Sequence, residues 1–512
     1  MKTVRTDRKQ LPVLSAQAAS SDAAAAGVVR NDVDAPHVRV GFVTLGCDKN
    51  TVDSERMLAR LLGAGASIAE RPEEADVVVV NTCGFIESAK EESIEAILDA
   101  ARLKADGQVR AVVAAGCLVQ RYRDELSAEM PEVDLFLSLS EADRLVPELK
   151  QRGLLPERAV PTMERPLRVI TSRLPHTSYL KISEGCDHSC AFCAIPLMRG
   201  KFRSTPMDVL VGEARELAAA GVKELNIVSQ DTTWYGRDWR RGHVESDEAS
   251  YFMGRGFEGM AGPRPSESGS RVAAGAADTV GLEDLLRRLV AETEIPWLRL
   301  FYMYPSGITR ALVDLMAAEP RILPYLDMPI QHGSDAVLTR MRRPERRATI
   351  LERVGWLRDS IPDLALRTTV IVGFPGETED DFEQLLDLLE RVRFDQVGAF
   401  AYSVEEGTRA ADMADQVPDS VKRERLERLG DLQRAISLER NEARIGRVVP
   451  ALIDRLESDG GAVGRTAAQA LEVDGVTLIR GAAAAGLRAG RFADVRIVDA
   501  LDQDVIAEPV AS

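Results

Sequence analysis

The chain has 512 residues, of which 45% are apolar, 29% charged and 5% aromatic. This length exceeds what one hydrophobic core supports and predicts about three domains. No apolar run reaches the roughly 20 residues that a membrane-spanning helix needs, which excludes a helical membrane protein. The net charge of −16 and the pI near 5.1 favour a basic partner over a polyanionic one, because proteins that bind phosphate backbones usually carry a basic face.

Residues 1–37 join a basic start, "MKTVRTDRKQ", to an Ala-rich stretch. A secretory signal is the tempting interpretation, but Gln17, Ser20, Ser21 and Asp22 interrupt the apolar segment. We therefore expect a disordered tail and a cytoplasmic protein. Thiols stay reduced in the cytoplasm, so clustered cysteines there more often bind metal than form disulfides.

Between residues 38 and 155 a pattern of strand, turn and helix repeats three times. Each predicted strand ends at a cysteine: "VRVGFVTLG" at Cys47, "ADVVVVNT" at Cys83 and "VRAVVAAG" at Cys117. Short apolar strands that alternate with helices predict a parallel α/β sheet. The carboxyl ends of parallel strands share one edge, where such sheets bind ligands, so the three thiols are a predicted ligand set. The alternative is that buried cysteines simply favour strand ends.

Residues 172–435 form a second α/β unit with six apolar strand segments, which predicts an open, partial (β/α)6 barrel with its chemistry at the carboxyl ends of the strands. A cysteine-rich loop, "EGCDHSCAFCAIP", follows the first of these strands, "SYLKIS", and so lies at that face. Residues 239–280 are rich in Gly, Ser and charge without a period, and we expect a flexible insertion there.

The last segment, residues 440–510, changes character after an amphipathic helix. Short apolar segments joined by Gly-containing turns predict a small antiparallel β-barrel. Barrels of this kind often bind nucleic acid, but from Asn441 to Ser512 this one has 11 acidic residues against 8 arginines and no lysine.

The cysteine-rich loop places Cys186, Cys190 and Cys193 within eight residues. Cysteine thiolates are the usual ligands of iron–sulfur clusters, and three of them leave the fourth iron of a four-iron cluster open. A zinc site would need a fourth protein ligand, and His188 lies too close to its neighbours in the loop to be an easy one. Zinc and inert core cysteines are the alternatives.

The loop "CDHSCAFC" resembles the CxxxCxxC loop of radical S-adenosylmethionine (SAM) enzymes, with Phe192 at the aromatic position before the third cysteine. Upstream, "LGCDKNTVDSE", "NTCGFIESAKEESIEAI" and "AAGCLVQRY" resemble the N-terminal domain of the methylthiotransferases, and the terminal barrel resembles their TRAM domain. The resemblance covers about residues 38–508 and uses all six cysteines. "CDKNTVDSE", "CGFIESAKEES" and "RGKFRS" resemble the RimO-type branch, whereas the tRNA-modifying MiaB-like branch tends to carry "CQMN".

The resemblance implies two 4Fe-4S clusters and SAM, which serves as radical source and methyl donor. The catalytic cluster would be held by Cys186, Cys190 and Cys193, and its open iron would bind SAM and cleave it to a 5′-deoxyadenosyl radical. An auxiliary cluster that delivers sulfur would be held by Cys47, Cys83 and Cys117. Radical chemistry is required because the hydrogen on the β-carbon of an aspartate is not acidic enough for a side-chain base to remove.

The resemblance also implies SAM contacts beside Phe192. "SQDTTWYG" follows the second strand, where relatives hold the SAM amino group, and this implies Gln230 and Asp231. "VIVGFPGE" resembles the stretch that lies along adenine and implies Gly373 and Glu377, although a Gly-Pro turn after a core strand explains it equally well. "PIQHGSD" puts His332 at the same edge, where a structural histidine is an equal interpretation.

The implied function is transfer of a methylthio group to the β-carbon of an aspartate in small-subunit ribosomal protein S12. The alternatives are a tRNA (adenosine) methylthiotransferase of the MiaB type and a non-catalytic metal-bound RNA-binding or scaffold protein. The acidic charge matches basic S12, free or in the ribosome, and we expect neither tRNA nor a membrane as a partner. An electron donor such as flavodoxin or ferredoxin would also be needed.

Overall fold

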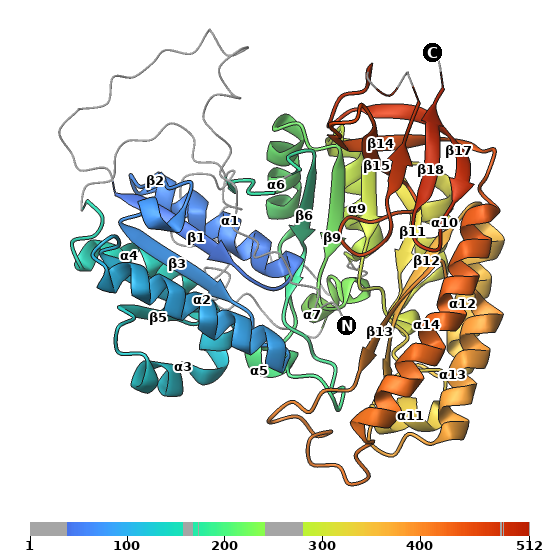
Figure 1. The fold of residues 1–512 in the computed structure, drawn as a ribbon, viewed down its shortest axis with the longest axis horizontal. Coiled ribbons are helices and arrows are strands. Elements are labelled where there is room, and N and C mark those ends of the chain that lie inside the picture. Colours follow the sequence, from blue (N-terminus) through green and yellow to red (C-terminus); the bar gives the residue numbers. More distant parts are fainter. Residues whose placement is uncertain are drawn as a thin grey trace, which may run out of the picture. The chain divides into compact units, whose positions relative to one another are not determined.

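A computed structural model describes residues 38–156, 167–172, 174–240 and 280–510, apart from 482, 483 and 485 (Figure 1). The expected tail at residues 1–37, and residues 241–279 of the insertion expected at 239–280, therefore lie outside the described residues. Contacts divide the chain into two compact units. The first comprises Met1–Arg173, Leu197–Gly200 and Asp238–Thr279, and the second comprises Leu174–Pro196, Lys201–Arg237 and Val280–Ser512.

The first unit is built on a five-stranded sheet in the order β2-β1-β3-β4-β5, with every neighbouring pair parallel. The three predicted strands are confirmed as β1 (Arg39–Thr44), β3 (Val77–Thr82) and β4 (Ala111–Gly116). The short edge strands β2 (Ser67–Ile68) and β5 (Leu135–Leu137) were not predicted, because two or three residues carry too little periodicity.

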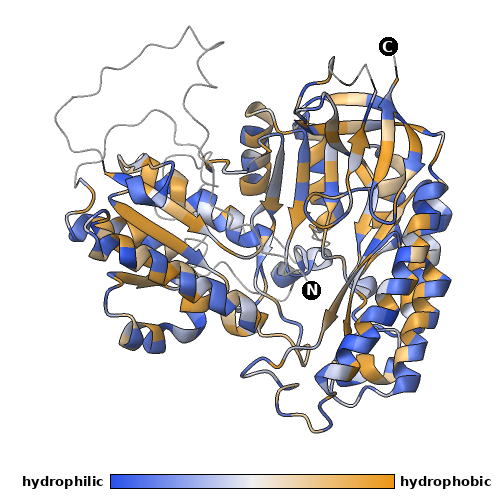
Figure 2. Cartoon of the chain, in the orientation of Figure 1, coloured by the Kyte–Doolittle hydropathy of each residue, from blue (hydrophilic) through white to orange (hydrophobic). Residues whose placement is uncertain are grey.

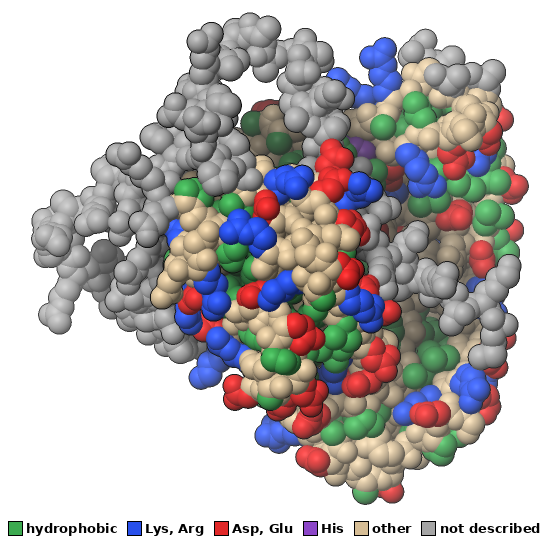
Figure 3. Space-filling view, turned by 60° about the vertical axis from the view of Figure 1, so that its left-hand side comes forward, with side chains coloured by type: hydrophobic (Ala, Val, Ile, Leu, Met, Phe, Trp, Pro, Cys, Tyr) green, Lys and Arg blue, Asp and Glu red, His purple; other side chains and the backbone are tan. Residues whose placement is uncertain are grey.

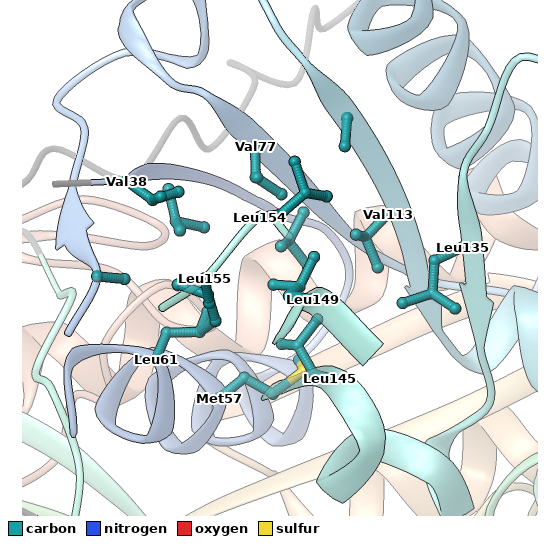
Figure 4. Close-up of a cluster of buried hydrophobic side chains, with 14 of the residues drawn as sticks. Val38, Met57, Leu61, Val77, Val113, Leu135, Leu145, Leu149, Leu154 and Leu155 are labelled. Atoms are coloured by element: carbon teal, nitrogen blue, oxygen red, sulfur yellow. The ribbon is translucent and has the colours of Figure 1, made fainter. Parts of the chain in front are cut away.

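Both faces of this sheet are buried, as the apolar colouring of its strands suggests (Figure 2). Along β3, Val77 and Val79 join one core with α1 and α4, while Val78 and Val80 join another with α2 and α3. Figure 4 shows the first of these cores, with Met57 and Leu61 opposite Val77 and Val113. The helical segments of the unit are α1 (Asp48–Gly63), η1 (Pro72–Glu74), α2 (Glu87–Ala105), α3 (Cys117–Glu129), η2 (Leu139–Arg144) and α4 (Leu145–Gln151).

The second unit contains a six-stranded sheet in the order β13-β12-β11-β10-β9-β6, again with every pair parallel. The predicted open, partial barrel of six strands is therefore confirmed. The strands are β6 (Thr177–Lys181), β9 (Glu224–Val228), β10 (Trp297–Leu300), β11 (Ile322–Asp327), β12 (Ala365–Val372) and β13 (Gln396–Ala401).

Helices connect successive strands of this sheet, and α14 leads from its last strand to the barrel. They are α6 (Met207–Ala219), η3 (Thr232–Trp234), α7 (Arg237–Arg240), α9 (Leu282–Glu292), η5 (Pro305–Gly307), α10 (Arg310–Ala318), α11 (Asp335–Arg340), α12 (Arg347–Ser360), α13 (Glu379–Val392) and α14 (Asp419–Glu442). None of the described helices is long and apolar enough to cross a membrane.

The end of the chain forms a closed barrel in the order β14-β15-β16-β18-β17. Its strands are β14 (Val448–Leu456), β15 (Ala462–Thr466), β16 (Thr477–Ile479), β17 (Phe492–Ala500) and β18 (Val505–Pro509). The expectation of a wholly antiparallel barrel is wrong in one respect, since β16 and β18 pair in parallel. A ring of five strands cannot alternate direction all the way round, so one neighbouring pair must run in parallel.

The barrel belongs to the second unit and packs at the amino ends of β6 and β9 (Figure 1). Glu224, the first residue of β9, is fully buried between Arg299 of β10 and Arg465 of β15. Arg299 Nε donates to Glu224 over 2.7 Å, and Arg465 also binds Asp454 of β14 through Nε at 2.8 Å. Burial would raise the pKa of Glu224, but the two guanidinium groups outweigh it and lower the pKa. These buried ion pairs hold the barrel to the sheet.

Replacing Arg465 with Leu should destabilise the second unit by about 3–5 kcal/mol, because it leaves two buried carboxylates without their shared cation. Urea unfolding followed by tryptophan fluorescence measures this change. Arg455→Leu is the matched control on β14, since Arg455 is 62% exposed and lies 3.8 Å from Glu457, and it should cost less than about 0.5 kcal/mol. Equal losses from the two variants would contradict the importance of the buried network.

Candidate functional site

Three cysteines lie at the carboxyl edge of the first sheet. Cys47 follows β1 and caps α1, Cys83 follows β3, and Cys117 follows β4 and begins α3. Because β1, β3 and β4 are neighbours in the sheet, the three thiols lie side by side along one edge. Cys47 is exposed, Cys83 is half-buried and Cys117 is buried, so the set opens outward from the sheet.

Glycine lets the three cysteine loops approach one another. Gly46 has a φ of +88°, and a Cβ there would lie 2.8 Å from the Cβ of Cys83. Gly116 has a φ of +104°, and a Cβ there would lie 2.4 Å from Oδ1 of Asn81. Any other residue at either position would force the loops apart, because real Cβ atoms do not come so close to their neighbours and the backbone itself would be strained.

Asn50 ties the same loops together from the first turn of α1. Its Nδ2 donates to the carbonyl oxygens of Leu45 at 2.8 Å and Thr82 at 3.0 Å, beside the ends of β1 and β3. Its Oδ1 lies 3.7 Å from Sγ of Cys117, which donates to it. One fully buried amide therefore links the ends of all three strands that carry thiols.

Arg199 brings a positive charge to this edge. It belongs to the first unit, as part of Leu197–Gly200, and its side chain is almost fully buried. Nη2 donates to Oδ1 of Asn50 at 2.6 Å and to Asp53 at 3.2 Å. Burial raises the pKa of Cys117 to about 12, and the Arg199 guanidinium opposes that rise.

The other three cysteines lie in the loop after β6. Two short strands, β7 (Ser183–Glu184) and β8 (Arg203–Ser204), pair antiparallel and close the base of this loop. Cys186 and Cys190 are buried, and Cys193 is half-buried just before α5 (Ile195–Arg199). Burial raises the pKa of Cys186 and raises that of Cys193 to about 12.

Hydrogen-bond donors face two of these sulfur atoms. The backbone N–H of Ile195 donates to Sγ of Cys193 at 3.5 Å, and Nη1 of Arg343 donates to Sγ of Cys190 at 3.9 Å. The hydroxyl of Tyr304 also lies 3.9 Å from Sγ of Cys190. These donors would stabilise negatively charged sulfur, the form in which cysteine binds metal.

A stack of side chains fixes the first half of the loop. The ring of His188 stacks on Tyr304 with centroids 4.3 Å apart and planes 4° apart, and it contacts Trp234 at 4.5 Å. Its Nε2 lies 2.7 Å from Oδ2 of Asp231. The guanidinium of Arg343 covers the Tyr304 ring at 3.9 Å. His188 is therefore held by three neighbours and positions the loop between Cys186 and Cys190.

The predicted SAM contacts lie around the same sheet edge. Some of these side chains already form hydrogen bonds or ring contacts within the protein. Asp231 accepts hydrogen bonds from the backbone and hydroxyl of Thr233 besides its contact with His188, and Gln230 beside it is half-buried. Phe192 is half-buried and meets Phe374 edge to face at 6.5 Å.

The segment that follows β12 is bound in a similar way. Gly373 has a φ of +72°, and a Cβ there would lie 2.3 Å from the Lys422 side chain. Glu377 accepts from the backbone of Phe374 at 3.0 Å and from Arg425 at 2.8 Å. His332 is fully buried, its Nδ1 accepts from the backbone of Ser334 at 3.0 Å, and its Nε2 lies 3.5 Å from Oε2 of Glu377.

All six cysteines are free thiols, and each set presents sulfur ligands only. In the part of the chain that the structure describes, no three His, Cys, Asp or Glu side chains are arranged to hold one metal ion. A four-iron cluster makes a different demand, because each thiolate binds a separate iron atom. The all-sulfur donor sets, with N–H and guanidinium groups facing them, fit such clusters.

Three family models match the chain in order: "Uncharacterized protein family UPF0004" at residues 39–138, "Radical SAM superfamily" at 180–389 and "TRAM domain" at 445–510. Relatives named "Ribosomal protein uS12 methylthiotransferase RimO" match over nearly the whole length. The one from Anaeromyxobacter sp. (strain K) is 45% identical and the match covers 92% of this chain and 93% of the relative. The one from Desulforudis audaxviator is 43% identical, with 93% and 97% covered.

The chain belongs to the RimO family of radical SAM methylthiotransferases. The RimO-type resemblance seen in the sequence is thereby confirmed, as is the assignment to the transferases. Radical SAM methylthiotransferases use SAM and 4Fe-4S clusters, which agrees with the cofactors expected from the cysteine motifs. The relative from Symbiobacterium thermophilum, 42% identical over 92% of this chain and 91% of its own length, carries the same name.

Sequence reasoning missed four residues that lie beside the two cysteine sets. Asn50 and Arg199 stand in the quoted motifs "CDKN" and "RGKFRS", so the signal was present without a role attached. Tyr304 and Arg343 lie 114 and 153 residues from Cys190, and nothing local in the sequence connects them to the cysteine loop.

In reduced, cluster-free protein, iodoacetamide should modify Cys47 first and the buried Cys117 and Cys186 last. Cys47 is exposed, whereas burial raises the pKa of both Cys117 and Cys186. With a pKa of about 12, the Cys117 thiol is ionised in about one molecule in ten thousand at pH 8. Peptide mass spectrometry under anaerobic conditions measures the order, and protein unfolded in urea, where all six thiols should react alike, is the control. Equal rates in the folded chain would contradict the described burial.

Proposed function

We propose that this protein adds a methylthio group to the β-carbon of an aspartate in ribosomal protein S12. The observation that carries the proposal is similarity over almost the whole chain to relatives named for that activity, at 42–45% identity for three of them. The MiaB-type alternative is not favoured by these relatives. The substrate assignment therefore comes from full-length relatives and not from one shared domain.

We assign Cys186, Cys190 and Cys193 to the cluster that binds SAM, and Cys47, Cys83 and Cys117 to the auxiliary cluster. When bound, the clusters supply the electron that cleaves SAM and the sulfur that is transferred. Support for the assignment comes from the two all-sulfur sets at the carboxyl edges of two parallel sheets, where α/β proteins bind ligands.

The protein prepares Cys186, Cys190 and Cys193 for metal by placing hydrogen-bond donors beside them and by excluding water. Arg343 is fully buried, and burial would lower its pKa, but Tyr304, Glu345 and Cys190 raise it overall, so the guanidinium stays charged. A fixed positive charge 3.9 Å from Sγ of Cys190 stabilises a thiolate there. His188 and Asp231 hold the loop so that the sulfur positions are set before metal arrives.

Asn50 and Arg199 do the same for the set made of Cys47, Cys83 and Cys117. Asn50 fixes the spacing of the three strand ends, and Arg199 carries positive charge to them while Asp53 holds its guanidinium in place. The SAM contacts expected at Phe192, Gln230, Asp231, Gly373 and Glu377 stay predictions. The hydrogen bonds of Asp231 and Glu377 give each of these carboxylates a positioning part as well.

Charge supports a basic protein substrate. The chain carries −16, and Figure 3 shows Lys and Arg side chains lying among Asp and Glu side chains on the face it draws. Ribosomal proteins are basic, and opposite net charge speeds their encounter with an acidic enzyme. We propose accordingly that tRNA is not a substrate, that the protein acts in the cytoplasm, and that a flavodoxin or ferredoxin donates the electron.

Replacing Cys186, Cys190 and Cys193 together with Ala should remove about four of about eight irons and abolish SAM cleavage. Replacing Cys47, Cys83 and Cys117 should remove the other four irons and leave SAM cleavage largely intact. Iron analysis and chromatography of 5′-deoxyadenosine after anaerobic reconstitution provide the two measurements. If either triple variant kept both clusters, the assignment of the two sets would be wrong.

Reduced enzyme supplied with SAM and sulfide should methylthiolate S12 and leave unmodified tRNA unchanged. Mass spectrometry of both substrates from one reaction measures the outcome, and the variant lacking Cys186, Cys190 and Cys193 is the control. The rate at low S12 concentration should fall as salt is raised, because screening weakens the attraction between opposite net charges. Methylthiolation of tRNA alone would overturn the proposal in favour of the MiaB-type activity.

A further inference from the structure

A cavity of about 300 Å³ lies in the second unit, between the carboxyl ends of α12 and α14 and the loop that leads into β12. Figure 1 shows both helices on the same flank of the sheet, together with α13. Four arginines line the cavity, and we call this cavity the four-arginine pocket. The lining residues are Arg358, Ile361, Pro362, Asp363, Leu364, Arg440, Ala443, Arg444 and Arg447.

Two carboxylates offset part of this charge. Asp395 accepts from Arg444 at 2.6 Å and from Arg440 at 3.1 Å, while Asp363, on the rim, pairs with Arg447. Arg358 has its Nη2 on the carbonyl oxygen of Arg393 at 2.9 Å, a neutral partner. Four guanidinium groups against two carboxylates leave two positive charges around the cavity.

A purely structural role is the alternative, because cations near the carboxyl ends of helices offset the helix dipole. Neighbouring carboxylates would then neutralise the arginines, as Glu224 and Asp454 neutralise Arg465. These two carboxylates raise the pKa of Arg465 against the effect of burial. Two of the four arginines, Arg358 and Arg444, differ from Arg465 in this respect. Burial and then repulsion from Arg440 lower the pKa of Arg358, and burial lowers that of Arg444 despite Asp395. The positive charge around the cavity exceeds what the protein itself neutralises.

We propose that the four-arginine pocket binds a phosphate group. Guanidinium groups present paired N–H donors that match phosphate oxygens, and an anion there would relieve the repulsion among the arginines. The volume is at the lower end of the range for ligand sites, enough for a phosphate group. Such a group could be free phosphate or part of a nucleic-acid backbone, and both present the same oxygens to the pocket.

The cluster-loaded enzyme should bind radiolabelled inorganic phosphate in equilibrium dialysis at an ionic strength held constant with potassium chloride. Arg358→Gln and Arg447→Gln should each weaken binding about tenfold or more, the usual effect of losing a charge-assisted hydrogen bond. Asp363→Asn should tighten binding about two- to fivefold, because it removes a rim carboxylate that repels the anion. A residue with only a structural role would not produce this gain.

Arg434→Gln is the matched control, because Arg434 lies on the same helix, α14, is 57% exposed and pairs with Asp431 outside the pocket. It should leave phosphate binding unchanged. A short single-stranded RNA added as competitor separates the two sources: displacement of phosphate indicates a backbone phosphate, and its absence indicates the free anion. Failure of the enzyme to bind phosphate, or equal binding by all variants, would overturn the proposal. SAM cleavage plays no part in the measurement, so the outcome is independent of the proposed function.

Discussion

Both cysteine sets depend on one constraint, which is that the strands of each sheet run in the same direction. In a parallel sheet every strand ends at the same edge, so residues some 35 positions apart in the chain become neighbours. Cys47, Cys83 and Cys117 use this once, each one residue or a few beyond a strand of the first unit. The cysteine loop uses it again after β6, at an edge also reached by Tyr304 and the segment that follows β12. No local motif could gather so many groups without that shared direction.

Buried charge is the second demand that shapes the molecule. An unpaired ion in the interior is costly, and Arg465 and Arg343 are two buried arginines whose charges are met in different ways. Arg465 holds Glu224 and Asp454 and thereby joins the terminal barrel to the sheet, whereas Arg343 lies among Glu345, Tyr304 and a cysteine sulfur. The first arrangement is complete within the protein. In the second arrangement, Arg343 also faces Sγ of Cys190, an atom that can itself bind a ligand such as a cluster iron.

Much of the fold could be predicted from sequence because apolar segments and turn residues are local signals. The three strands before Cys47, Cys83 and Cys117 and the six strands of the partial barrel follow from such segments. What could not be predicted depends on contacts between distant residues. The stack of His188 on Tyr304 joins positions 116 residues apart, and the parallel pairing of β16 with β18 follows from barrel closure and not from any residue in either strand. The sequence contained Asn50, but only the three converging strand ends give it a role.

Net charge and local charge lead to different expectations in this protein, and the difference has a physical reason. A charge of −16 acts at long range, where it favours encounter with a basic partner. The four-arginine pocket acts over a few ångströms, where screening by solvent is weaker and geometry decides. Arg358 and Arg440–Arg447 lie some 80 residues apart, so a sum over the sequence hides their meeting. An acidic enzyme can therefore approach a basic ribosomal protein and still hold a phosphate group. A ribosomal protein surrounded by nucleic acid is the kind of surface that presents both charges at once.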